Sequence, residues 1–211
     1  MSEGKSTEQL QADIAELEQK LYGLTLELAQ MRREVPRMAG ALVPDYEFST
    51  CDGSTSLKNL FGDKDLLMMI HNMGQACRYC TLWGDGFNGL LPHLESAMSV
   101  VLVSKDDPDT QRRFANHRGW RFRLASHGGG SYIQEQSALP DQNNMPGVVI
   151  YERKGDEVRR RDSAVFGPGD LYCSAWNLLA LAGLTEADWM PQYNYWRRPA
   201  KLEDGGENVI D

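Results

Sequence analysis

Cys77 and Cys80 are separated by two residues and are the part of this chain best suited to chemistry. The apolar run Leu66–Ile70 comes before them and predicts a buried strand, and the segment after them predicts a helix. Unpaired N–H groups and a partial positive charge at a helix N-terminus favour a thiolate. In such settings the pKa of a cysteine falls from about 8.5 to roughly 3.5–7.5. Two sulfurs on one helical turn also lie within disulfide reach, so the spacing indicates a redox-active pair.

Thiol–disulfide exchange through a mixed disulfide is the chemistry that this pair favours. Cys77 is the candidate nucleophile and Cys80 the resolving thiol, although the sequence leaves the reverse assignment open. Arg78 lies between them, and its charge is expected to lower the pKa of both thiols. Cys51 and Cys173 stand alone in the sequence and are interpreted as small packing residues.

Three further residues near the pair are candidates for a role in the site. His71 has an unperturbed pKa close to neutrality, which suits proton transfer; the alternative is a hydrogen-bonded core histidine. Trp83 and Asp85 follow the cysteines on the expected helix and are candidates for shaping the site. Core packing is the favoured interpretation of Trp83, and Asp85 would interact favourably with the helix dipole whether or not it belongs to the site.

Metal binding is the rival interpretation of the same cysteines. Cys77 and Cys80 with His71, or with His127, could form a three-ligand copper or zinc site. A closed zinc site normally has four ligands, and no second CxxC or HxxxH motif is present. A third possibility is a non-catalytic domain that docks partners. No organic cofactor is expected, because no glycine-rich nucleotide-binding motif follows a strand.

Composition places the chain among globular proteins, with 41% hydrophobic and 25% charged residues in a length of 211. The net charge of −8 disfavours nucleic-acid and anionic-membrane partners. The one compact basic run, Arg159–Arg161, is interpreted as a solvated strand face. A long apolar segment and a signal-like N-terminus are absent, and four cysteines are too few for a disulfide-stapled secreted scaffold. A cytoplasmic protein is therefore expected.

Residues 1–35 predict a separate coiled-coil-like helix, in which apolar residues recur at spacings of four and three. These are Leu10, Ile14, Leu17, Leu21, Leu24, Leu28 and Met31. Ser6 and Gln9 form a potential capping box, and Pro36 ends the helix. Such a narrow stripe either pairs with a second copy in a homodimer or lies across its own domain.

Residues 36–199 predict an α/β domain, and residues 200–211 a disordered acidic tail. Strands are expected at residues 46–48, 66–70, 99–104 and 120–124, and in a hairpin formed by residues 147–151 and 157–161. Helices are expected at residues 57–61, directly after the cysteines, at 108–118 and at 171–181. Glycines at 84, 86 and 89 predict a distorted or interrupted helix after the cysteines. A CxxC pair beside a βαβ pattern indicates a thioredoxin-like fold, a central mixed sheet flanked by helices.

A resemblance to known families supports this fold. The segment Met145–Asp156 resembles the proline–strand–turn segment of thioredoxins and of AhpC/TSA peroxidase-like proteins, and Val100–Phe114 with Trp120–Phe122 is similar to AhpC/TSA domains. The resemblance implies that Pro146, preceded by Met145, is a cis-proline lying against the cysteine pair. It also implies a proton-shuttling role for His71, which occupies the offset of a buried carboxylate in thioredoxins.

The segment Cys80–Gly89, with His71–Met73 before it and Gly119-Trp120 after it, resembles a bacterial thioredoxin-like family known as domain-of-unknown-function family 899. That family also has a Trp-Arg-Arg segment, as at Trp196–Arg198. The resemblance covers roughly residues 36 to 199. It implies the fold, because the family has no settled activity. The cysteine pair itself indicates an oxidoreductase acting on protein or small-molecule disulfides or thiols, with an antioxidant pathway as one setting.

The peroxiredoxin pattern Pro-x-x-x-Thr-x-x-Cys is absent in both possible registers. Counting back from Cys80 places Met73 and Cys77 at the proline and threonine positions, and counting back from Cys77 places Ile70 and Gly74 there. The chain is therefore not expected to be an ordinary peroxiredoxin.

Overall fold

A computed structural model describes residues 5–192 of the chain, so the expected acidic tail and the Trp196–Arg198 segment lie outside the described residues. The chain divides into two compact units, Met1–Ala39 and Gly40–Asp211. None of the helices in residues 5–192 is both long and apolar enough to cross a membrane.

The first unit consists of helix α1, Thr7–Glu34. Its N-terminus carries the expected capping box: the Gln9 amide N–H donates to Ser6 Oγ at 3.2 Å and the Ser6 N–H donates to Gln9 Oε1 at 2.9 Å. The helix ends two residues before Pro36, which cannot continue it. No residue of α1 is buried, and the seven apolar side chains of the stripe are all exposed.

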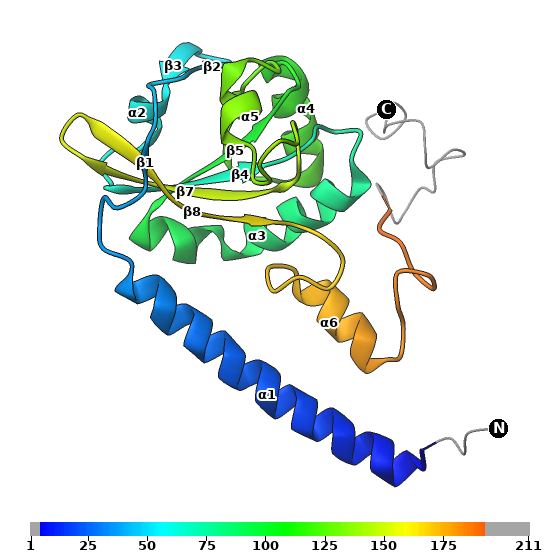
Figure 1. Cartoon of the computed structure of the whole chain (residues 1–211). Helices are drawn as coiled ribbons and strands as arrows, with labels where there is room; N and C mark the ends of the chain where they lie inside the picture. Colours follow the sequence, from blue (N-terminus) through cyan, green and yellow to red (C-terminus); the bar gives the residue numbers. More distant parts are fainter. Residues whose placement is uncertain (1–4, 193–211) are drawn as a thin grey trace. The chain divides into compact units, whose positions relative to one another are not determined.

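Residues 40–192 contain one eight-stranded mixed sheet with the strand order β1-β8-β7-β4-β5-β6-β2-β3 (Figure 1). The strands are β1 Ala41–Leu42, β2 Glu47–Thr50, β3 Gly53–Ser56, β4 Leu66–His71, β5 Ser99–Ser104, β6 Arg123–Ser126, β7 Gly147–Lys154 and β8 Glu157–Val165. Strands β4, β5 and β6 are parallel, whereas β7 runs antiparallel to β4. The buried valine- and leucine-rich runs thus occupy the centre of the sheet, as expected for strands covered on both faces.

Helices cover both faces of the sheet. They are α2 Leu57–Leu60, α3 Arg78–Ala97, α4 Pro108–Arg118, α5 Ser131–Gln136 and α6 Ser174–Leu181. Alternation along β4 sends Leu67 and Met69 into one core with residues of α2 and α5. Met68 and Ile70 point to the opposite core, which is filled by residues of α3, α4 and α6. We name these the α5 face and the α3 face.

Helix α3 is continuous over its 20 residues, so of the two expected outcomes, a distorted or an interrupted helix, the interruption was wrong. The physical reason is visible at Gly84, where a Cβ atom would lie 2.5 Å from Trp120 Cζ2. Glycine here lets the indole pack directly on the helix backbone. Gly86 and Gly89 have no such neighbour within 4 Å.

Several other elements differ from the sequence-based expectation. The third parallel strand is Arg123–Ser126 rather than 120–124, because Trp120 and Phe122 are buried in the α3-face core before the strand begins. Helix α5 and the short strands β1 and β3 had not been predicted. The hairpin strands β7 and β8 are longer than expected and contain a register shift between Ile150 and Tyr151.

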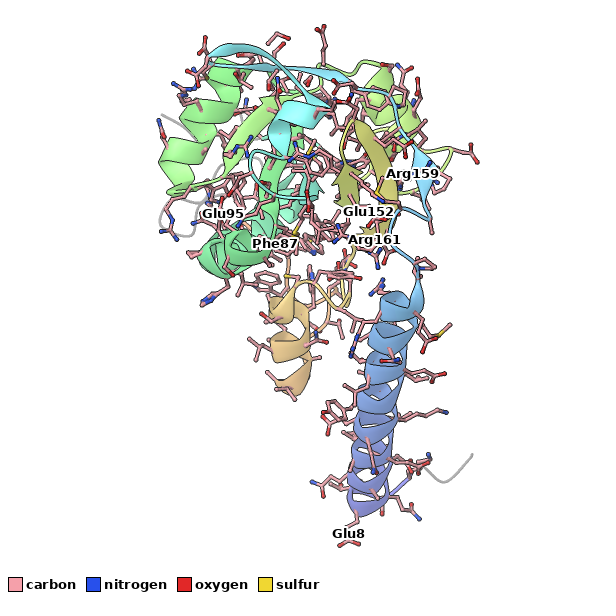
Figure 2. All side chains as sticks on the ribbon, turned by 90° about the vertical axis from the view of Figure 1, so that its left-hand side faces the viewer. Glu8, Phe87, Glu95, Glu152, Arg159 and Arg161 are labelled. Carbon is pink, nitrogen blue, oxygen red and sulfur yellow. The ribbon has the colours of Figure 1, made fainter. Side chains whose placement is uncertain are left out.

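The basic run of β8 is not simply a solvated face. Arg161 lies at the register shift, and its guanidinium pairs with the carboxylate of Glu152, a fully buried residue, at 3.3 Å. Figure 2 shows these two side chains and Arg159 on the β7–β8 hairpin. Arg159 donates to the Gly40 carbonyl and Arg160 to the Ser137 carbonyl. The three arginines therefore hold β8 to its surroundings.

Candidate active site

The loop between β4 and α3 delivers the cysteine pair and is held by polar contacts. The Asn72 N–H donates to the Val103 carbonyl at 2.9 Å, which continues the contact between β4 and β5. Asp106, just beyond β5, accepts a hydrogen bond from the Gln75 N–H at 2.7 Å. Gly74 has a φ of +116°, and a Cβ there would lie 2.7 Å from Asp106 Oδ1. Glycine is thus required for this close approach.

Sequence reasoning missed Asp106, although a signal was available. A polar residue directly after a buried parallel strand lies at the carboxyl edge of the sheet, where the neighbouring strand β4 also ends. Burial raises the pKa of this carboxyl, and the Gln75 N–H opposes that rise.

Cys77 is the N-cap residue of α3 and is half-buried. Its Sγ accepts a hydrogen bond from the Cys80 N–H at 3.1 Å. The pKa of the Cys77 thiol is lowered, first by a hydrogen bond from the Cys80 thiol and then by the N–H groups of Cys80 and Tyr79, while burial opposes the shift. A capping sulfur at this position benefits most when it carries a negative charge.

Cys80 has the opposite character. It is 3% exposed, and its Sγ accepts a hydrogen bond from the Met73 N–H at 3.5 Å. The pKa of the Cys80 thiol is raised well above its ordinary value, because it donates to Cys77, is buried and lies beside the Cys77 charge. The pair therefore consists of one accessible thiol with a lowered pKa and one buried thiol with a raised pKa.

Arg78 is the first residue of α3 and is half-buried. Its Nη2 donates to Met190 Sδ at 3.4 Å, and the guanidinium lies 5.8 Å from the centre of the Tyr79 ring. Its charge lowers the pKa of Cys77 less than the hydrogen bonds from Cys80 and Tyr79 do. Tyr79 in turn donates to Glu186 at 2.8 Å, so the segment after α6 is attached beside the cysteines.

His71 is not brought to the cysteines. It lies two residues after Met69 in β4, so its side chain projects to the α5 face, where Nε2 is 2.8 Å from the Tyr132 hydroxyl. Burial, then the charges of His127 and Arg160, lower the pKa of His71 to about 3. The ring is therefore neutral at physiological pH, in the manner of a core histidine.

The same geometry speaks against the alternative three-ligand metal site. His127 also lies near Tyr132, with ring centroids 6.3 Å apart. Within residues 5–192, no three side chains of the His, Cys, Asp or Glu types are grouped so that they could hold a metal ion. Both histidines lie beside Tyr132 of α5, whereas the two cysteines lie at the N-terminus of α3.

Trp83 and Asp85 anchor α3 to other segments of the domain. Trp83 is 2% exposed, stacks on Phe166 with centroids 5.8 Å apart, and donates to Asp170 at 3.0 Å. Asp85 lies in the interior of α3 rather than at its N-terminus, and accepts hydrogen bonds from Arg118 and from Trp120 Nε1, the latter at 2.8 Å. Both residues therefore have structural contacts.

Pro146 lies directly before β7, whose first residue, Gly147, pairs with His71 at the end of β4. The half-buried Met145 precedes it, and the Asn144 amide donates to the Met73 carbonyl at 3.5 Å. The segment thus borders the loop that carries the cysteines. No peptide bond in the described residues is cis, so the expected cis-proline was wrong; the chain turns instead at Asn144, with a φ of +58°.

A family profile described as "Bacterial protein of unknown function (DUF899)" matches residues 5–201 of the chain. The chain belongs to this family. Comparison with curated proteins gave no match.

Solved structures similar to this DUF899 chain include peroxidoxin BcpB from Mycobacterium tuberculosis, at 20% identity and a TM-score of 0.50, over 68% of this chain and 93% of that one. A cysteine-to-serine mutant of PrxQ from Xylella fastidiosa is 16% identical with a TM-score of 0.50, over 69% of this chain and 96% of that one. These similarities, with the mixed sheet and its flanking helices, confirm the thioredoxin-like fold. At such identities they establish the fold alone.

Proposed function

We propose that this DUF899 protein is a thiol–disulfide oxidoreductase in which Cys77 is the nucleophile and Cys80 the resolving thiol. The observation that carries the proposal is the asymmetry of the pair. Cys77 caps α3 and has a lowered pKa, whereas Cys80 is buried behind it and has a raised pKa. The thiolate is the nucleophile in disulfide exchange, so this asymmetry favours Cys77 over the reverse assignment.

The reaction begins when the Cys77 thiolate attacks one sulfur of a substrate disulfide. A Cys77–substrate disulfide forms, the substrate S–S bond breaks, and one substrate sulfur leaves as a thiolate. The Cys80 sulfur, after losing its proton, then attacks Cys77 Sγ and displaces the second substrate thiolate. The substrate disulfide gains two electrons and two protons, and the protein ends with a Cys77–Cys80 disulfide.

The proposed substrate is a protein or small-molecule disulfide, and the reverse direction would oxidise a dithiol. We place the protein in the cytoplasm, where thiols are kept reduced and a dithiol of this kind can be regenerated. An antioxidant pathway would use the same exchange.

The test is a redox titration of the purified full chain against glutathione mixtures, with intact-mass detection and peptide mapping. The expected result is a reversible loss of about 2 Da that maps to a Cys77–Cys80 disulfide. The Cys51→Ser and Cys173→Ser variants are matched controls and should titrate like the wild type. A Cys77→Ser, Cys80→Ser double variant should show no such transition.

Thiol alkylation by iodoacetamide distinguishes the two roles. At neutral pH, Cys77 should be labelled first in the reduced wild type. In the Cys77→Ser variant, Cys80 should be labelled more slowly than Cys77 is in the wild type, because Cys80 is buried. Faster labelling of Cys80 than of Cys77 would reverse the assignment. A double variant that keeps full activity in its cellular role would leave a docking module as the function.

Homodimer formation through α1 is a separate proposal. Seven exposed apolar side chains follow a heptad stripe on a helix of 28 residues, none of which is buried. Most helical stability in proteins comes from packing of an apolar face, so such a stripe favours a partner. A second copy supplies the same stripe, as in a two-stranded coiled coil with leucine at most core positions.

A further inference from the structure

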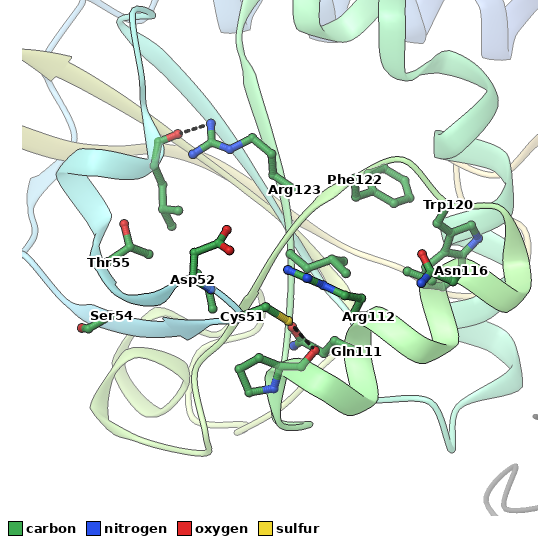
Figure 3. Close-up of a pocket in the computed structure, with 15 residues that line it drawn as sticks. Cys51, Asp52, Ser54, Thr55, Gln111, Arg112, Asn116, Trp120, Phe122 and Arg123 are labelled. Atoms are coloured by element: carbon green, nitrogen blue, oxygen red, sulfur yellow. Dashed lines mark hydrogen bonds between the residues drawn. The ribbon is translucent and has the colours of Figure 1, made fainter.

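A cavity of about 550 Å³ lies on the opposite side of β6 from β5, outside the cysteine site (Figure 3). It exists because two strands diverge. All four residues of β6 pair with β5, but only Ser126 of β6 pairs with β2, through Ser49. The β2–β3 hairpin therefore separates from Arg123 and Leu124, and the turn at Cys51-Asp52 stands opposite α4. Pockets of roughly 300–1,000 Å³ commonly hold small organic ligands.

One wall of the cavity is apolar and aromatic. It includes Trp120 and Phe122, whose rings meet edge to face with centroids 5.9 Å apart. Leu60, Ala115 and Leu124 extend the same wall. Edge-to-face geometry of this kind suits a further aromatic ring, because aromatic groups prefer offset or perpendicular packing.

The remaining lining is polar and contains two arginines. Arg112, on α4, is exposed and makes no hydrogen bond or ion pair with any residue in the described part of the chain. Arg123 Nη1 donates to the Leu60 carbonyl at 3.0 Å, so its guanidinium is fixed in place with further N–H groups to donate. Figure 3 shows both arginines and Asp52 among the residues that line the cavity.

The charge balance of the cavity is positive, with two guanidinium groups against one carboxylate. An anion is the group that guanidinium binds best, through charge-assisted hydrogen bonds. The Asp52 carboxylate accepts hydrogen bonds, so a donor elsewhere on the ligand would satisfy it.

We propose that this cavity binds a small aromatic anion, with its acid group at Arg112 and Arg123 and its ring against Trp120 and Phe122. The site is independent of the cysteine pair and needs no redox step. Cys51 provides a local reporter, because it lines the cavity and its thiol lies 3.3 Å from the Pro108 carbonyl.

The experiment uses the full chain and two probes of one shape, 2-naphthalenesulfonate and its neutral analogue 2-naphthalenesulfonamide. Each is titrated while Cys51 is alkylated with N-ethylmaleimide, and the label is mapped by mass spectrometry. The sulfonate should protect Cys51 from alkylation in a saturable manner. The sulfonamide should need a concentration about tenfold higher or more for the same protection, because hydrogen bonds to charged groups contribute more than those between neutral groups. Peptide mapping separates Cys51 from Cys77, so the result does not depend on the proposed oxidoreductase activity.

Two variants and one matched control decide the outcome. Arg112→Gln should raise the half-protecting sulfonate concentration about tenfold, and Asn116→Trp should abolish protection by filling the cavity from α4. Arg113→Gln removes a neighbouring exposed arginine that does not line the cavity, and should behave like the wild type. Equal protection by the two probes, or an equal effect of Arg112→Gln and Arg113→Gln, would overturn the proposal.

Discussion

Acid should destabilise this protein through His71, because a histidine buried in a neutral state cannot accept a proton without loss of stability. The pKa of His71 is lowered from 6.5 to about 3, first by burial and then by the charges of His127 and Arg160. The unfolded chain therefore binds a proton at this residue between pH 6.5 and 3 that the folded chain does not bind. Stability contributed by the neutral ring is complete above pH 6.5 and is lost progressively as the pH falls.

The magnitude follows from the width of this window. One pKa unit corresponds to about 1.4 kcal/mol, and pH 5 lies about 1.5 units below the pKa of His71 in the unfolded chain. His71 should therefore lower the free energy of unfolding by about 2 kcal/mol at pH 5 relative to pH 7.5. His127 has a pKa lowered to about 4 by burial and by Lys105, and should add a similar loss. Two such terms are a large part of an ordinary stability of roughly 5–15 kcal/mol.

The assay is urea unfolding followed by tryptophan fluorescence at pH 7.5 and 5.0, at one fixed protein concentration. The His71→Gln variant should lose about 2 kcal/mol less than the wild type between the two pH values. His117→Gln, at an exposed position, is the matched control and should lose as much as the wild type. If His71→Gln and the wild type lose the same amount, the buried neutral state assigned to His71 is wrong.

Three further outcomes follow from contacts already described. Cys80→Ala should raise the pKa of Cys77, measured by the pH profile of Cys77 alkylation. Cys80→Ser keeps a hydrogen-bond donor and should raise this pKa less. An unchanged profile in both variants would contradict the hydrogen bond from Cys80 as the main cause of the lowered Cys77 pKa. Gly84→Ala should destabilise the fold by about 1–3 kcal/mol in thermal or urea unfolding, because the added Cβ overpacks against the Trp120 indole. Gly86→Ala adds a Cβ with no neighbour within 4 Å and should stabilise the fold by up to about 1 kcal/mol in the same assay. Leu21→Lys should convert a dimer to a monomer in sedimentation velocity while leaving the fluorescence of the second unit unchanged, and a monomeric wild type would refute dimerisation through α1.

The central strands were predictable because their composition allows one interpretation. The run Ser99–Ser104 is a strand over its full length, buried at every position as a parallel strand in a covered sheet should be. Helix α4 begins with Pro108 in its first turn and ends before Gly119, which has a φ of +68°. These signals act over a few residues, so they need no knowledge of the rest of the fold.

The failed expectations depended on contacts between distant segments. The glycines of α3 predicted a distorted or interrupted helix, but α3 is continuous, and at Gly84 it packs against Trp120, more than thirty residues away in the sequence. The offset of His71 from Cys77 placed it near the thiols in sequence. Strand alternation then turned its ring to the α5 face, where Tyr132 could not have been foreseen as a partner because α5 itself was not predicted.

The absence of His71 from the cysteine site changes how the resolving step can work. Two of the causes that raise the pKa of Cys80 are its hydrogen bond to Cys77 and the charge of Cys77. When the Cys77 thiolate attacks a disulfide, its sulfur becomes neutral, and both causes disappear at the moment at which Cys80 must lose its proton. The Met73 N–H remains to stabilise the Cys80 thiolate, and the departing substrate thiolate is a proton acceptor created in the same step. On the proposed mechanism, the first attack therefore prepares the second without a separate base.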